Sequence, residues 1–154
     1  MIVRDEAGFV GGFEVLPFGL LVFVAGALLL TNGWAVVDGT LASSAAAREA
    51  ARAYVEATSE GEAHEAAVAA ARAVIEGHGR DPARMTIRWD PGPTFERCAR
   101  NTVIVEYRVP TLTVPFVGAF GDGVVTTSGR HTEVVDPYRS ELDLDGFEAE
   151  ACHA

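Results

Sequence analysis

The feature that most constrains this chain is an uncharged, apolar run close to its N-terminus. The run covers residues 15–37 and is bounded by Glu14 and Asp38. As a helix rising about 1.5 Å per residue, its 23 residues span roughly 34 Å, enough to cross a bilayer core with some tilt. A soluble core helix of this length would show a polar stripe, whereas this run has only Thr31 and Asn32. We therefore predict a single membrane-spanning helix.

A cleaved secretory signal is the competing interpretation of the same run. The small residues at 41–45 could be accepted by a signal peptidase. However, the apolar stretch exceeds the usual ~7 to 15 residues, and the first eight residues, MIVRDEAG, have one arginine against Asp5 and Glu6. These features favour a retained anchor.

The helical period continues beyond Asp38, because apolar and small residues recur at spacings of three and four as far as Ala57. We expect one long helix over about residues 10–57, whose second half leaves the membrane. Its small residues form a stripe that we expect to be exposed and able to accept a neighbouring helix closely: Ala42, Ala46, Ala50 and Ala53. The high helix propensity of alanine explains the same pattern without any partner.

A second helix and a small sheet follow. Ser59 and Glu62 have the spacing of a capping box at a helix start, and Gly77 and Gly79 precede the helix-terminating Pro82. From residue 84 the period changes to two, which predicts strands at about 84–89, 100–113 and 124–135. We therefore expect an α+β fold: a long N-terminal transmembrane helix, a second helix and a small three-stranded antiparallel sheet.

The 154 residues accommodate one modest domain plus an anchor. We divide the chain into a leader at 1–14, the transmembrane helix at 15–37, an extracytoplasmic α+β domain at 38–135 and an acidic tail at 136–154.

The tail carries six carboxylates and one arginine. Its Glu141-x-Asp143-x-Asp145-Gly146 pattern partly matches a calcium loop, but the twelfth position is Cys152 where such a loop needs glutamate. A solvated acidic tail without a metal is the favoured interpretation.

Charge and residue spacing argue against several classes of function. The net charge is −10 and lysine is absent, so the chain is not expected to bind nucleic acid. The four histidines, at positions 64, 78, 131 and 153, lack metal-ligand spacing. No glycine-rich turn suggests a nucleotide, and no serine has a nucleophile context. We predict a protein that is not an enzyme and has no catalytic residues, metal or cofactor.

Cys98 and Cys152 are the only cysteines, and both lie outside the apolar run. An extracytoplasmic compartment would permit a disulfide between them. The position of Cys152 in the acidic tail argues against pairing, so the sequence leaves the question open.

The N-terminal fifty residues or so resemble a known family. The segments EAGFVGGFEVLPFGLLVF and SSAAAREAARAY resemble the TadE-like minor pilins of tight-adherence (Flp) pilus systems, which are related to type IV pili. Residues 103–132 are similar, more loosely, to the strand, proline-rich loop and strand of that family.

The resemblance implies a processing site. Family members usually carry glutamate at the fifth position after a cleaved glycine, whereas cleavage after Gly8 would place Glu14 at the sixth. A fifth-position glutamate would require cleavage after Phe9. By this resemblance Gly8, Phe9 and Glu14 are the assembly and processing residues, and a prepilin peptidase is an expected partner.

The resemblance also implies a structural role as a minor pilin (pseudopilin) or pilus-assembly protein. Its partners would be the membrane and other pilin subunits, contacted through the N-terminal helix, with the N-terminus in the cytoplasm. Two alternatives remain open. One is an unprocessed single-pass anchor that presents an extracytoplasmic interaction domain. The other is a secreted domain that begins near residue 45.

Overall fold

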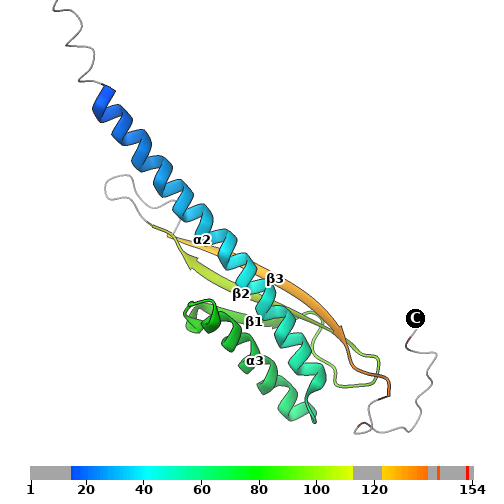
Figure 1. Ribbon diagram of the computed structural model, residues 1–154. Helices are drawn as coiled ribbons and strands as arrows, with labels where there is room; N and C mark the ends of the chain where they lie inside the picture. The colour runs from blue at the N-terminus through cyan, green and yellow to red at the C-terminus, as the bar shows by residue number, and fades with distance from the viewer. Residues whose placement is uncertain (1–14, 113–122, 139–141, 143–151, 153–154) are drawn as a thin grey trace, which may run out of the picture.

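The computed structural model describes residues 15–112, 123–138, 142 and 152. Their elements are helix α2 (Val15–Glu56), helix α3 (Glu60–Gly77), the short 3₁₀ helix η2 (Pro82–Arg84), and strands β1 (Met85–Trp89), β2 (Arg100–Pro110) and β3 (Val124–Val134) (Figure 1). The predicted α+β class, with a long apolar N-terminal helix, a second helix and a three-stranded antiparallel sheet, is confirmed.

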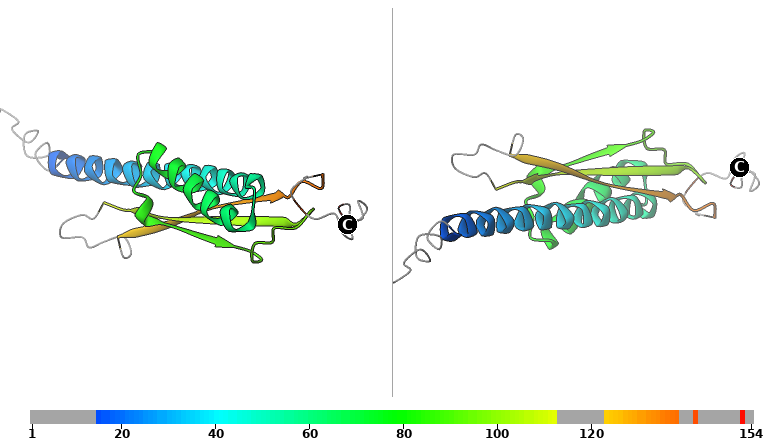
Figure 2. Two further views of the ribbon diagram at one scale, coloured as in Figure 1. Left: turned by 90° about the horizontal axis from the view of Figure 1, so that it is seen from below. Right: turned by 90° about the horizontal axis from the view of Figure 1, so that it is seen from above.

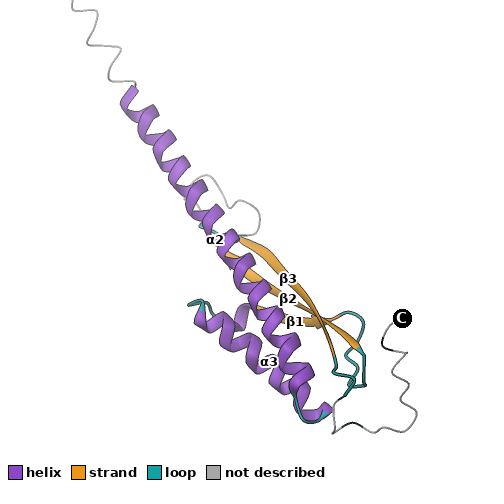
Figure 3. Cartoon of the chain, turned by 45° about the vertical axis from the view of Figure 1, so that its right-hand side comes forward, coloured by secondary structure: helices purple, strands orange, loops and turns teal. Residues whose placement is uncertain are grey.

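Helix α2 is continuous over 42 residues but lies in two environments. Its first half extends away from the sheet and from α3 (Figures 1 and 3). Large apolar side chains on this half are exposed, including Leu16, Phe18, Phe23 and Leu30. It is long and apolar enough to cross a membrane, and its most apolar window has no residue buried inside the protein. A soluble core helix would be buried, so that interpretation does not fit this half.

Helix α3 begins where the capping pattern predicted. Ser59 is the N-cap, and its hydroxyl accepts a hydrogen bond from the Glu62 N–H at 3.4 Å. The Glu62 carboxylate accepts from the Thr58 hydroxyl, so only half of the expected capping box forms. One face of α3 is fully buried: Ala63, Ala67, Ala71 and Ile75.

The three strands pair in the order β1-β2-β3, all antiparallel, with Ile87 opposite Val105 and Val105 opposite Gly129. Both helices cover the same face of this sheet (Figure 2). The alternating residues of β2 that face the helices are buried, as the period-two pattern predicted: Val103, Val105, Tyr107 and Val109.

The prediction that the alanine stripe of α2 is exposed is wrong. Ala42, Ala46 and Ala50 have no exposed surface, and Ala53 is partly buried. Their short side chains let α2 approach the chain's own sheet and α3 closely, instead of a helix from another molecule. The stripe is therefore core.

Aromatic side chains fill the core at the end far from the apolar half of α2. The Tyr54 ring lies 4.6 Å from that of Trp89 and 5.8 Å from that of Phe95, between ring centroids. Burial, reinforced by the carboxylate of Glu60, raises the pKa of the Tyr54 phenol, so this side chain stays neutral. These rings supply apolar area that the alanines cannot.

Candidate membrane-boundary groove

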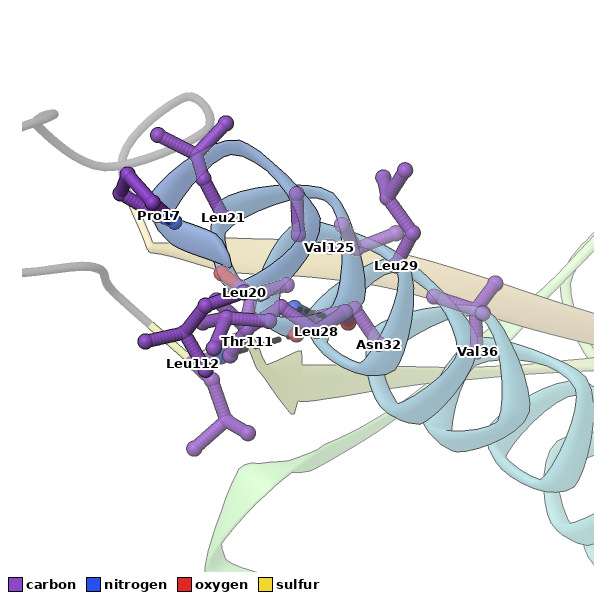
Figure 4. Close-up of a pocket in the computed structure, with 13 residues that line it drawn as sticks. Pro17, Leu20, Leu21, Leu28, Leu29, Asn32, Val36, Thr111, Leu112 and Val125 are labelled. Atoms are coloured by element: carbon purple, nitrogen blue, oxygen red, sulfur yellow. Dashed lines mark hydrogen bonds between the residues drawn. The ribbon is translucent and has the colours of Figure 1, made fainter. Parts of the chain in front are cut away.

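A groove of about 910 Å³ lies between the apolar half of α2 and the near ends of β2 and β3 (Figure 4). We call it the boundary groove. Its wall is almost entirely apolar and combines residues distant in sequence, among them Leu20, Val24, Leu28, Leu112 and Val125. The groove continues the exposed apolar surface of α2 onto the sheet.

One polar side chain fixes the sheet to the apolar half of α2. The side-chain oxygen of Asn32, Oδ1, accepts a hydrogen bond from the Leu112 N–H at 2.8 Å, and its side-chain nitrogen, Nδ2, donates to the Leu28 backbone carbonyl at 3.0 Å. An asparagine in an apolar helix is costly unless its polar atoms are satisfied. Here both are, and one of them holds the end of β2.

Just beyond the apolar run, Arg80 joins three parts of the fold. Its guanidinium donates to Asp38 Oδ2 (Nε to Oδ2 3.0 Å) and to the Ala35 carbonyl at 3.0 Å. It also lies over the Tyr107 ring, 5.2 Å from the centroid. The Arg80 side chain is 12% exposed and that of Asp38 is 40% exposed, so this pair is screened less than a surface pair. Asp38 is the first charged residue after the apolar run, so this pair marks the end of the groove nearest the domain.

Two glycines determine how close the sheet comes to α2. A Cβ atom on Gly129 of β3 would lie under 3.0 Å from backbone atoms of Ser43 and Ser44, nearer than Cβ atoms normally approach. A Cβ on Gly39 would lie 2.6 Å from the Val109 methyl group. The sequence interpretation missed both residues. An isolated glycine inside a strand pattern was the signal that could have found Gly129.

At the far end of the sheet, Cys98 and Cys152 form a disulfide with a Cα–Cα distance of 5.2 Å, within the normal range for such bonds. The guanidinium of Arg97, next to Cys98, donates to the Pro137 and Leu142 carbonyls. These contacts hold parts of the C-terminal segment against the domain.

We expect Cys98 and Cys152 to resist alkylation in the folded protein. Closure of a loop of 54 residues removes unfolded-state entropy, worth roughly 4 kcal/mol in the chain-entropy model. Intact mass after iodoacetamide treatment should show no adduct without reductant, and one adduct on each cysteine after reduction and denaturation. Alkylation of both thiols without reductant would contradict the bond.

The other predicted site residues lie outside the described part of the chain. Gly8, Phe9 and Glu14 precede Val15, and the carboxylates of the calcium-like pattern belong to the undescribed tail positions. Within the described residues, no group of three or more His, Cys, Asp or Glu side chains could hold a metal ion. The long-range contacts that the structure reveals are instead those of Asn32 with Leu112, of Arg80 with Asp38, and of the two glycines with the elements that face them.

No family model, curated protein or solved structure matches this chain.

Proposed function

We propose that this protein is a membrane-anchored structural subunit, a minor pilin or pilus-assembly protein of a tight-adherence pilus. The observation that supports this best is the division of α2. One half is an apolar rod whose most apolar window has no residue buried inside the protein, and the other half packs against α3 and the sheet. The TadE-like sequence at the N-terminus supplies the specific family.

The mechanism is exchange of apolar environments. In the bilayer, lipid covers the exposed half of α2. Its transfer to water would cost about 25 cal/mol for every Å² of apolar surface, so the helix leaves lipid only when other apolar helices cover it. Lateral packing against neighbouring pilin helices meets that requirement. The Arg80–Asp38 pair keeps the domain fixed to α2 in either environment.

The N-terminal segment would control both proteolytic processing and the axial register between neighbouring subunits. A prepilin peptidase would cut after Gly8 or Phe9 and create a new α-amino group. Glu14 would neutralise that amine on a neighbouring subunit, because a carboxylate beside an apolar helix needs a cation once water is excluded. This pairing would determine the axial register between helices.

The domain is assigned to the outer side of the membrane, with the N-terminus in the cytoplasm. The Cys98–Cys152 bond supports this orientation, because disulfides persist in oxidising compartments and are rare in the cytosol.

We expect protease added to intact cells with a permeabilised outer layer to digest residues 60–154, the part of the domain after α2 together with the tail. A cytosolic marker protein in the same cells should survive, which controls for lysis. Immunoblotting with an antibody against the domain gives the result. Protection equal to that of the marker would contradict the orientation.

The proposed function is tested by purification of pilus components from cells that express the tagged chain. Co-purification together with a shortened N-terminus, detected by intact mass, supports a processed pilin-like subunit. An intact N-terminus and no pilus partner would instead favour an unprocessed membrane anchor that presents an interaction domain. A mature chain that begins near residue 45 would identify a secreted domain.

A further inference from the structure

We propose that the near end of the β2–β3 hairpin is a second membrane contact, and that phospholipid acyl chains fill the boundary groove and cover Leu112 and Val124. The inference rests on the proposed membrane anchoring of α2 and does not depend on pilus assembly. Through this contact the sheet itself would help to hold the domain against the bilayer.

The hairpin end lies beside the apolar part of α2, beyond the charged and interfacial residues. Asp38, paired with Arg80, is the first charged residue after the apolar run. Asn32 precedes Asp38 by six positions, which places it about 9 Å deeper at 1.5 Å per residue. Trp34 lies between them and is 75% exposed, as suits an interfacial aromatic. Because Leu112 is hydrogen-bonded to Asn32, the hairpin end lies below the level of Trp34.

The side chains at this depth suit lipid. Leu112 is 53% exposed and Val124 is 45% exposed, although both are large and apolar. The described residues between Arg108 and Arg130, at 109–112 and 123–129, carry no charge. Exposure of this apolar surface to water is unfavourable. Acyl chains can cover it without removing water from polar groups.

The backbone N–H groups at the hairpin end are also compatible with an apolar medium. Unpaired N–H groups exclude most irregular backbone from lipid. Here Pro110 has no N–H, the Thr111 N–H donates to the Gly123 carbonyl at 3.0 Å, and the Leu112 N–H donates to Asn32. These three consecutive residues thus present no free backbone N–H group, although the buried Thr111 hydroxyl has no hydrogen-bond partner among the described residues. Asn32 is therefore the residue that makes Leu112 compatible with the membrane.

The groove itself favours acyl chains over water. Its wall has almost no polar surface, and the amide of Asn32 is already engaged on both its oxygen and its nitrogen. A buried water needs two to four polar partners, whereas the described side chains that line the groove offer one unpaired polar atom, the Thr111 hydroxyl oxygen. Since the groove is continuous with the exposed surface of α2, the lipid that surrounds the helix also reaches the groove (Figure 4).

The test is photocrosslinking of the full chain in phosphatidylcholine vesicles. We would replace Leu112, or in a second variant Val124, with p-benzoylphenylalanine; both positions are exposed, so the fold tolerates the change. After irradiation, intact mass should increase by one phospholipid. A matched probe at Tyr138, which is 82% exposed at the far end of the domain, should give no lipid adduct. A crosslink from Leu112 and Val124 to a second copy of the chain, without a lipid adduct, would overturn the inference.

A probe at Phe23, which is 73% exposed in the apolar half of α2, separates the two proposals. A lipid adduct at Phe23 with none at Leu112 or Val124 would overturn the hairpin contact and leave the anchor intact. Absence of adducts at all three positions would overturn both. Adducts at all three, with none at Tyr138, are the expected result.

Discussion

Gly129→Ala is expected to destabilise the domain strongly. The new Cβ atom would lie under 3.0 Å from the backbone of α2 at Ser43 and Ser44, and backbone cannot rotate away as a side chain can. Either β3 or α2 must shift, which disturbs the contacts of the buried alanines. Overpacking typically costs about 1 to 3 kcal/mol, and we expect the upper part of that range. The midpoint of thermal unfolding should fall by roughly 10 °C.

Two other glycine-to-alanine changes provide matched controls. Gly39→Ala meets only side-chain atoms of Val109 and Thr127, so its effect should be smaller. Gly61→Ala lies on α3 with nothing within 4 Å of the new Cβ, and should be neutral or mildly stabilising because alanine favours helix. Circular dichroism of the detergent-solubilised, oxidised chain measures all three. Equal midpoints for Gly129→Ala and Gly61→Ala would contradict the close-approach argument.

Glu14→Ala is expected to leave membrane insertion intact and abolish assembly. In a packed bundle of apolar helices, removal of the carboxylate would strand a neighbour's α-amino group. Loss of one partner from a buried pair costs about 3 to 5 kcal/mol, against about 1 kcal/mol or less for an exposed pair. That cost corresponds to at least a hundredfold weaker association. Insertion depends on the apolar run, which the substitution does not alter.

Further variants separate charge from volume. Glu14→Gln keeps the size of the side chain and should fail almost as badly, because charge is the property required. Glu49→Ala removes an exposed carboxylate from the second half of α2 and should assemble normally. The measurements are membrane fractionation and co-purification with pilus components. Normal assembly of both Glu14 variants would reduce Glu14 to a headgroup-level residue and favour the unprocessed anchor.

Most of the fold could be predicted because its signals are local. The period-two alternation of Val103, Val105 and Tyr107 predicted a half-buried strand, and Ser59 predicted the start of α3. In each case a residue's neighbours in sequence carry the information. The boundary groove could not be predicted in this way, because Leu28 and Leu112 belong to segments that nothing in the local sequence pairs.

The alanine stripe of α2 shows most clearly what the sequence alone could not predict. Small residues at helical spacing predict a close approach, but they do not identify what approaches. In the structure the chain's own sheet makes this approach. It can do so because Gly129 of β3 has no side chain to contact the backbone at Ser43. Gly129 is 86 positions from Ser43 in sequence, and only the folded backbone brings the two together.

By itself, the sequence determined that one long helix has an apolar half fit for a membrane and that a helix and three strands follow it. Uninterrupted hydrophobicity and fixed periods of 3.6 and 2 are properties of consecutive residues. The tertiary structure alone decided that α2 is the centre of its own core, that Arg80 closes on Asp38, and that Asn32 holds Leu112 at membrane depth. These contacts join residues 42 and 80 positions apart, and their geometry depends on the packing of every element between them.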